Sequence, residues 1–365
     1  MLIKAFGIAA IALLAIAGLA LLQRGRGETA PVHNETSVPT PTFGVEWQEV
    51  PGNPALTPGA CFSWRCAGVG DPTIVVDGRG TLSVWFTTMG IKQENGAYVA
   101  TGPMIGRAVR DMPSSGTLHI VPEAPVIAVG SEAAWDRYVE TPTVRQIGNT
   151  LTMWYLGYSK PGFVAPAIGQ MTADDVTGTA WSRPGAPIYR PAPGAWDSQL
   201  VTGPNVLRGP DGVWRLYYAG FGVSNGRMRN GIGLLTSRDG KHWTAHPDNP
   251  LLERQPGAWD DEILEQAVVY ANGQYYLWYS GWRGELKADT AISIGLATSP
   301  DGIHWTRHAR NPVITPGAPG TWNDLRVLAP DVVVAPDGSL LMAAYGQSKK
   351  HAGREAGFIG FWSSR

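Results

Sequence analysis

The sequence predicts an all-β protein that folds as one five-bladed β-propeller, and an internal repeat is the main reason. The segment TSRDGKHWTAHPDNPLL at residues 236–252 returns as TSPDGIHWTRHARNPVI at residues 298–314, 62 positions later. Similarity at a fixed period indicates a repeat architecture. The 365 residues also include 46 Gly, 29 Pro and 15 Trp. Frequent turn residues together with many aromatic residues favour short strands over helices.

The repeat occurs five times, and each copy has the pattern of one propeller blade. Each copy starts with a tryptophan, which Pro or Ala follows about eight residues later: Trp64 and Pro72, Trp135 and Pro142, Trp196 and Pro204, Trp259 and Ala267, Trp322 and Pro330. A β-branched strand, an aromatic strand such as TLTMWYLGYS and a strand around Ile-Gly such as AIGQMT come next. A hairpin and a fourth strand end the copy, and Asp-Gly pairs at 239–240 and 301–302 predict tight turns there. Four short strands joined by tight turns are typical of a propeller blade.

The fifth copy ends at FIGFWSSR, without a fourth strand. The missing pattern lies near the other end of the chain, where VEWQEVPGNPALTPGA at residues 45–60 aligns with IHWTRHARNPVITPGA at residues 303–318. We therefore expect the N-terminal strand to complete the last blade and close one ring. Closure would pair strand edges that otherwise invite association with other chains.

The N-terminal region is predicted to be separate from the ring. Residues 5–22 form an unbroken apolar run, with Lys4 before it and Arg24 after it, long enough to span a bilayer. The predicted organisation is a signal anchor or signal peptide at 1–24, a flexible linker at 25–43 and the propeller at 44–365. No small-x-small cleavage site follows the run, which favours an uncleaved anchor. We expect the propeller on the periplasmic or extracellular face, attached to the membrane by residues 5–22, or secreted if the segment is cleaved.

Charge and cysteine content restrict the partners. The formal net charge is -1, which argues against a nucleic-acid partner because such proteins carry a strong basic excess. Cys61 and Cys66, the two cysteines, are predicted to form a local disulfide in an exported protein. No His or Cys pair accompanies them, so no metal site is predicted. No cofactor is expected, and a calcium ion in the pore has no support in the sequence.

Candidate catalytic residues lie just before the Pro or Ala of each copy, where the copies differ from one another. These positions read Gly70-Asp71, Glu140-Thr141, Thr202-Gly203, Glu265-Gln266 and Leu328-Ala329. Asp71, Glu140 and Glu265 are therefore expected to point at the axis from three blades, and Asp331 lies two residues further along in the fifth. Carboxylates that share one site can have pKa values pushed apart, which separates an acid from a base. The Asp of the Trp-Asp pairs recurs in three copies, which favours a structural role for it.

The ring as a whole resembles the five-bladed propeller glycosidases of families 43, 32, 68 and 130. GDPTIV at residues 70–75 matches the first-blade Asp-Pro of families 43 and 32, and SPDGIHW and YYLWYSG are common across the superfamily. The resemblance implies that Asp71 is the general base of an inverting enzyme or the nucleophile of a retaining one. It also implies that a second-blade carboxylate, which Glu140 matches within one residue, tunes the pKa values. The family's acid is usually a third-blade Glu before Gly-Pro, whereas this chain has Thr202 there.

The geometry of a five-membered ring offers a substitute for the missing acid. Blade four, like blade three, is two steps from blade one, so Glu265 is expected to face Asp71 across the pore. Inverting hydrolysis requires carboxyl groups about 6.5–9.5 Å apart, with room for one water. We therefore assign Asp71 as base and Glu265 as acid, with Glu140 as the alternative acid.

The loops between second and third strands are expected to border the pore mouth. They carry nine Lys or Arg and four Asp or Glu, an excess that would attract an anionic carbohydrate. The predicted substrate-binding residues are Asp331, Trp282, Arg283, Arg227 and Arg229. Trp282 would stack on a sugar ring. The alternatives are packing between blade tops for Trp282 and ordinary solvated loop charge for the arginines.

Taken together, these patterns predict an exported glycoside hydrolase that acts on a poly- or oligosaccharide with inversion. The alternative is a non-catalytic propeller that binds a glycan or scaffolds an envelope complex. A glycoside phosphorylase is a third prediction, because a basic mouth could hold phosphate.

Overall fold

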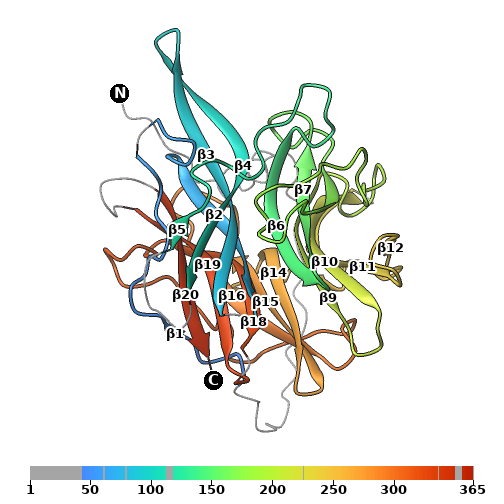
Figure 1. Cartoon of the computed structure of the whole chain (residues 1–365). Coiled ribbons are helices and arrows are strands. Elements are labelled where there is room, and N and C mark those ends of the chain that lie inside the picture. The colour runs from blue at the N-terminus through green and yellow to red at the C-terminus, as the bar shows by residue number, and fades with distance from the viewer. Residues whose placement is uncertain are drawn as a thin grey trace.

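The computed structural model describes residues 43–60, 62–78, 80–111, 118–224, 226–335, 337–349 and 356–364, and there the chain forms only strands, twenty in five sheets (Figure 1). The all-β prediction is confirmed. The predicted anchor at 5–22 and the linker up to residue 42 lie outside the described residues. Within the described residues, no helix has the length and apolar character needed to cross a membrane.

Four of the sheets follow the chain in order, each from an inner strand outwards. The first contains β2 (Gly68–Val76), β3 (Thr81–Glu94), β4 (Ala97–Asp111) and β5 (His119–Ile120). The second contains β6 (Tyr138–Ile147), β7 (Thr150–Tyr158) and β8 (Ala167–Thr172). The third contains β9 (Leu200–Arg208), β10 (Trp214–Ser224) and β11 (Arg227–Ser237), with β12 (Thr244–Ala245) and β13 (Leu252–Glu253) both paired to β11. The fourth contains β14 (Glu262–Ala271), β15 (Gln274–Trp282), β16 (Ser293–Ser299) and β17 (Thr306–Arg307).

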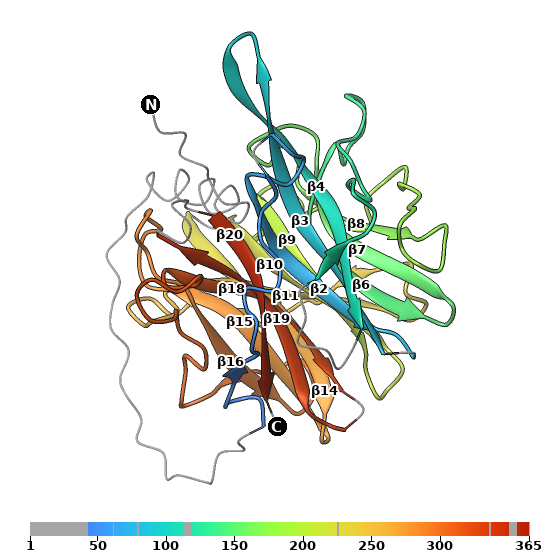
Figure 2. The ribbon, with the colours of Figure 1, turned by 60° about the vertical axis from the view of Figure 1, so that its left-hand side comes forward.

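The fifth sheet combines both ends of the described chain. It contains β18 (Arg326–Val334), β19 (Leu340–Ser348) and β20 (Ala356–Ser364), and β1 (Gln48–Glu49) pairs antiparallel with β20. The inner strands β2, β6, β9, β14 and β18 contact one another in this order, and β18 contacts β2. The five blades therefore surround one axis, while the hairpin of β3 and β4 projects beyond the ring (Figure 2).

An asparagine side chain marks the equivalent outer segment in three blades. The amides of Asn249 and Asn311 each bind both backbone groups of a third-strand residue, Leu234 and Leu296 respectively. Asn53 binds the N–H and C=O of Phe361 in the same way. The segment around Asn53 thus occupies in blade five the place that residues near Asn249 and Asn311 occupy in their own blades.

The Trp-Asp pairs belong to the scaffold. Asp136, Asp197 and Asp260 are buried, and each accepts a hydrogen bond from a second-strand tyrosine of its own blade: Tyr155 at 2.8 Å, Tyr218 at 2.8 Å and Tyr279 at 2.9 Å. The tryptophan lies flat on a glycine of the second strand. A Cβ added to Gly220 would lie 2.4 Å from the ring of Trp196, so no larger residue fits there. These contacts explain why the motif repeats.

Deleting residues 44–54 is expected to destabilise the whole propeller. The deletion removes the β1–β20 pairing, the two hydrogen bonds between Asn53 and Phe361, and the bond of 2.9 Å from the Trp278 indole to the carbonyl of Gly44. We expect the melting temperature to fall by roughly 10 °C or more, since about 1 kcal/mol corresponds to roughly 2–4 °C in a domain of this size. Removal of residues 1–42 alone is the control and should leave the transition in place. An unchanged transition after the longer deletion would show that this segment does not close the ring.

Candidate active site

Every inner strand contains a β-bulge near its start, which changes the direction of one side chain. In each blade the strand register shifts there, and the bulged residue has a positive φ: Asp71 at 46°, Thr141 at 49°, Gly203 at 54°, Glu265 at 24° and Ala329 at 50°. Bulges commonly occur next to active sites, where they redirect a side chain. Left-handed backbone is costly for residues other than glycine. The sheets thus hold Asp71 and Glu265 in a strained conformation at equivalent positions.

This equivalence corrects one part of the sequence alignment. The alignment placed Glu265 opposite Gly70 and Glu140, whereas the bulges place it opposite Asp71. The reason is that Ala267 was aligned with the prolines of the other copies, whereas Gln266 follows the bulge in blade four as Pro72, Pro142, Pro204 and Pro330 do in the others. Glu140 lies one residue before its bulge, and Asp331 two residues after.

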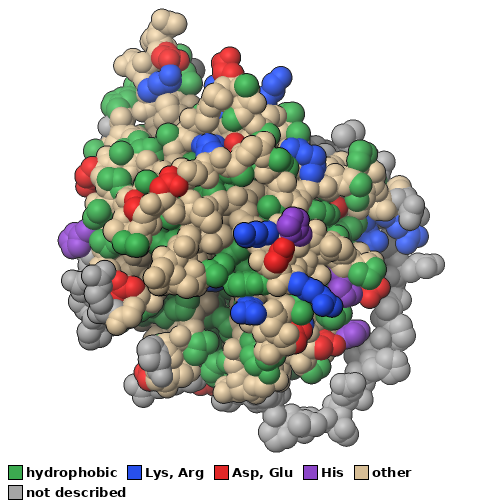
Figure 3. Space-filling view, turned by 45° about the vertical axis from the view of Figure 1, so that its right-hand side comes forward, with side chains coloured by type: hydrophobic (Ala, Val, Ile, Leu, Met, Phe, Trp, Pro, Cys, Tyr) green, Lys and Arg blue, Asp and Glu red, His purple; other side chains and the backbone are tan. Residues whose placement is uncertain are grey.

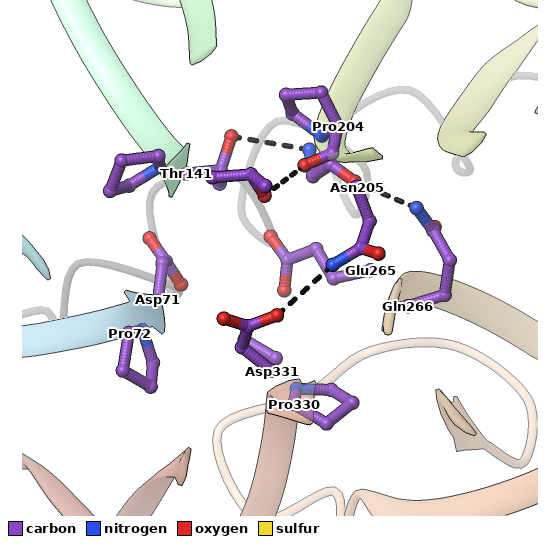
Figure 4. Close-up of a pocket in the computed structure, with 13 residues that line it drawn as sticks. Asp71, Pro72, Thr141, Pro204, Asn205, Glu265, Gln266, Pro330 and Asp331 are labelled. Carbon is purple, nitrogen blue, oxygen red and sulfur yellow. Dashed lines mark hydrogen bonds between the residues drawn. The ribbon is translucent and has the colours of Figure 1, made fainter. Parts of the chain in front are cut away.

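The bulges surround a central cavity of about 20 Å³, which has room for about one water molecule. The lining residues are Asp71, Pro72, Thr141, Pro142, Thr143, Gly203, Pro204, Asn205, Glu265, Gln266, Ala329, Pro330 and Asp331. The carboxyl groups of Asp71, Glu265 and Asp331 point toward one another across it (Figure 4). Glu140 is not among the lining residues; its Oε1 accepts a hydrogen bond from the Tyr158 hydroxyl. Blades one, four and five therefore bring together three of the carboxyl groups that the sequence analysis singled out, and Glu140 lies beside them.

Three of these carboxyl groups are buried with one oxygen free. Asp71 is 5% exposed, Glu140 1% and Glu265 4%. In the described part of the chain, Oδ1 of Asp71, Oε2 of Glu140 and Oε2 of Glu265 have no hydrogen-bond partner. A buried polar atom without a partner costs about 1–3 kcal/mol, so native proteins keep few of them. Three such atoms in one place indicate a site built to receive water or a ligand.

Burial shifts the pKa values of these carboxyl groups upwards. Desolvation raises the pKa of Asp71 to about 6, although a hydrogen bond from Thr87 opposes the shift. Desolvation and then the charge of Asp71 raise the pKa of Glu140 to about 8, opposed by the Tyr158 hydrogen bond. Desolvation, followed by the charges of Asp71 and Glu140, raises the pKa of Glu265 well above its usual value. At neutral pH Asp71 is therefore mostly ionised and Glu140 mostly protonated, while Glu265 holds its proton to a higher pH than an ordinary glutamate does.

Asp331 has a different environment, although it lines the same cavity. Its two oxygens receive hydrogen bonds from Arg145 at 2.7 and 3.1 Å and from the Asn205 amide at 3.1 Å. The Thr73 hydroxyl at 2.9 Å and the Ile74 N–H at 2.8 Å complete the set. Asp331 thus joins blade five to blades one, two and three, and both of its oxygens are occupied. These contacts are those of a structural acid rather than of the predicted substrate-binding residue.

The other predicted substrate-binding residues do not line the cavity. Trp282 is 2% exposed, so its ring offers no face on which a sugar could stack; packing between blades was the correct alternative. Arg229 pairs with Glu253, Arg227 is exposed on β11, and Arg283 is exposed with its Nε directed at the carbonyl of Ala258. On the face shown in Figure 3, basic and acidic side chains are interspersed. These arginines therefore fit the interpretation as ordinary solvent-exposed charged residues better than that as a basic rim around the pore mouth.

Two tyrosines contact the acidic cluster, a role that the sequence did not predict for either of them. Tyr158 holds Glu140, and the buried hydroxyl of Tyr345 has no partner in the described residues. Desolvation raises the pKa of Tyr345, and the nearby charges of Asp71 and Glu265 add to this shift, while Arg326 opposes it. A Cβ on Gly70 would lie 2.8 Å from the Tyr345 ring, so this glycine makes room for it. The sequence signal was present, since both tyrosines lie near the ends of the aromatic second strands.

The described residues provide no support for a disulfide. Cys66 is half-buried and free there, whereas Cys61 lies outside the described residues. Among the described residues, no group of three or more His, Cys, Asp or Glu is arranged to hold a metal ion.

Solved structures of five-bladed propeller glycoside hydrolases resemble this chain in fold. A structure of a BT0996 RGII complex has a TM-score of 0.67 and 15% identity, and the match covers 87% of this chain and 92% of the other. A thermostable family-43 glycoside hydrolase has a TM-score of 0.61 and 16% identity, and the match covers 80% of this chain and 88% of the other. A third structure comes from the GH130 family of mannoside phosphorylases, which contains hydrolases of β-1,2 mannosidic linkages in Candida mannan. It has a TM-score of 0.64 and 15% identity, and the match covers 91% of this chain and 97% of the other. At such identities the similarity shows the fold.

Relatives in sequence are uncharacterised. The proteins Rv1502 and MT1551 of two Mycobacterium tuberculosis strains are each 29% identical over 204 residues, which cover 53% of this chain and 66% of the relative. The match thus spans slightly less than two thirds of the relatives' length. No protein-family model matches the chain.

Proposed function

We propose that this protein is an exported glycoside hydrolase that cleaves a poly- or oligosaccharide at the mouth of the propeller pore. One observation carries the proposal: the buried carboxyl groups of Asp71 and Glu265, each with a free oxygen, meet at a water-sized cavity, where Asp71 is mostly ionised at neutral pH and the pKa of Glu265 is raised well above its usual value. An ionised base and a protonated acid in one site are what glycoside hydrolysis needs. The fold shared with glycoside hydrolases supports the same reaction class.

In the proposed mechanism, Asp71 is the base and Glu265 is the acid. Asp71 accepts a proton from the single water in the cavity, and that water attacks the anomeric carbon of a sugar held at the mouth. Glu265 donates its proton to the glycosidic oxygen as the bond breaks. A cavity that admits one water between the two groups favours inversion, because an inverting enzyme needs that water in place.

The third blade makes room for an acid from the fourth. A Cβ on Gly203 in its present conformation would lie 2.7 Å from Cγ of Glu265, so a larger residue would clash with the glutamate. The Gly203 carbonyl also accepts a hydrogen bond of 2.8 Å from the side chain of Gln266. Gly203, next to the Thr202 that stands where the resembled glycosidases usually have their acid, is thus the residue against which Glu265 packs.

A non-catalytic glycan-binding propeller is the second candidate, and the narrowness of the site favours it. The cavity holds water but no sugar ring, and Asp71 and Glu265 expose little surface to an incoming substrate. A phosphorylase is less well supported, because no Lys or Arg is among the described residues that line the cavity. The same observation argues against direct contact between the cavity and an anionic sugar.

A glycan screen distinguishes the three functions. The purified protein is incubated with neutral and acidic oligosaccharides, with and without inorganic phosphate, and the products are separated by anion-exchange chromatography. A hydrolase releases free sugars in both conditions, and a phosphorylase releases sugar phosphate only when phosphate is present. Saturable binding without any product supports the binding propeller and contradicts the proposed hydrolysis.

A further inference from the structure

A second cavity lies at the opposite end of the inner strands and is larger than the central one. It has a volume of about 450 Å³, within the usual range for small-molecule sites. Its lining residues are Arg145, Gln146, Val206, Leu207, Arg208, Gly209, Pro210, Trp214, Val268, Val269, Tyr270 and Val332. Most of them belong to the last residues of β6, β9 and β14, whereas the bulges lie near the first residues of these strands. We call this space the lower cavity.

The charged residues that line the lower cavity are both arginines. Arg208 is exposed, and its guanidinium lies 5.8 Å from the ring centre of Trp214. Among the described residues, only its Nε has a hydrogen-bond partner, the carbonyl of Gly212 at 3.0 Å. Asp211, in the turn between β9 and β10, pairs with Arg215 at 2.8 Å and so does not neutralise Arg208. The lower cavity therefore combines positive charge with unoccupied guanidinium N–H groups.

The rest of the lining is apolar or aromatic. Val206, Val268 and Val332 are buried, whereas Tyr270 is 36% exposed and so presents apolar surface to solvent. Trp214 is half-buried and already carries a guanidinium against its ring. A flat apolar body between these side chains would be covered on several sides, and an acidic group on it would reach Arg208.

The Arg145–Asp331 ion pair joins the two cavities. Arg145 lines the lower cavity and Asp331 the central one, and their closest atoms are 2.7 Å apart. Arg145 also donates to the carbonyls of Val206 and Val144, so its guanidinium is largely occupied. Arg208 is therefore the residue that can bind an incoming anion without loss of an existing ion pair.

We propose that the lower cavity is a binding site for a small amphipathic anion, namely a carboxylate or phosphate carried on a flat apolar group. Arg208 binds the anion, while Trp214, Tyr270 and the valines contact the apolar body. The site is separate from the acidic cluster, so the proposal does not depend on glycan hydrolysis.

The test is isothermal titration calorimetry with 2-naphthoate as the probe and 2-naphthylmethanol as its neutral counterpart. We expect saturable binding of 2-naphthoate and at least tenfold weaker binding of the alcohol. Arg208→Gln should weaken 2-naphthoate binding by about tenfold or more, the usual effect of losing a hydrogen bond to a charged group. Tyr270→Ala should weaken both probes. Arg238, exposed on the turn after β11, provides the control, and Arg238→Gln should bind as the wild type does.

Three results would overturn the proposal. These are no saturable binding at millimolar 2-naphthoate, equal binding of the two probes, or unchanged binding by Arg208→Gln. Arg208 and Tyr270 are surface side chains, so both variants should fold, and circular dichroism of each checks this. If inorganic phosphate alone binds as tightly as 2-naphthoate, the apolar part of the assignment is wrong.

Discussion

Asp71→Asn and Glu265→Gln should each reduce glycan hydrolysis by about 10²–10⁴-fold, the usual contribution of a general base or acid. Both substitutions preserve shape and remove the group that gives up or accepts the proton. The fold should remain, because neither free oxygen has a hydrogen-bond partner in the described residues. Turnover of whichever oligosaccharide the screen identifies is the measurement.

Two further variants make this result specific. Glu140→Gln should retain more activity, because Glu140 lies outside the cavity lining. It should also change the alkaline side of the pH profile, because the charge that Glu140 gains as pH rises toward 8 raises the pKa of Glu265. Glu132, whose side chain is 91% exposed on blade two, provides the control, and Glu132→Gln should behave as the wild type. If Glu265→Gln keeps near-normal turnover while Glu140→Gln is inactive, the general acid is Glu140 on blade two. Normal turnover by all three pore variants would place catalysis elsewhere.

Glu140→Gln is also expected to stabilise the protein at alkaline pH. The pKa of Glu140 rises from about 4.5 to about 8 on folding, so the folded state holds a proton that the unfolded state has lost. Stability from this group is complete below about pH 4.5 and is lost as pH rises to about 8. At 1.36 kcal/mol per pKa unit, the loss amounts to roughly 5 kcal/mol across this window. An amide carries no such proton and removes this pH dependence.

Urea unfolding at pH 5 and pH 8 measures the effect. Wild type should lose several kcal/mol of unfolding free energy between these values, and Glu140→Gln should lose much less. Glu132→Gln again provides the control, because an exposed carboxyl group should not change the slope. If Glu140→Gln is less stable than the wild type at both pH values, the carboxyl group of Glu140 stabilises the fold through its contacts. Its ionisation at pH 8 would then not destabilise the folded state. A gain in stability by Glu140→Gln at pH 8 would fit the general observation that active-site residues are retained for activity at a cost in stability.

The blades could be predicted from sequence because the scaffold repeats. The Trp-Asp pairs, the Asp-Gly turns and the Asn-Pro segments each form the same local contacts in several blades, so their recurrence reveals them. A proline directly follows the bulged residue in four blades, at Pro72, Pro142, Pro204 and Pro330. In blade four Gln266 takes this place, so no proline marked the bulge at Glu265. Without the bulges, the equivalence of Asp71 and Glu265 was hidden.

Burial at the site depends on contacts between blades, which local sequence does not record. Trp282 lies at the end of an aromatic strand whether it faces solvent or a neighbouring blade, and the structure places it inside. Asp331 looked like Asp71 and Glu265, yet four residues from three other blades occupy its oxygens. The size of the central cavity likewise depends on side chains from all five blades.

A crystal structure of the Glu265→Gln variant with a bound oligosaccharide tests the central claim most directly. The account predicts a sugar ring at the pore mouth, with its glycosidic oxygen within hydrogen-bonding distance of residue 265. It also predicts one water between the Asp71 carboxylate and the anomeric carbon. A glycan bound on the outer blade faces or in the lower cavity, with only water near Asp71, would contradict the assignment of these carboxyl groups as a glycosidase site.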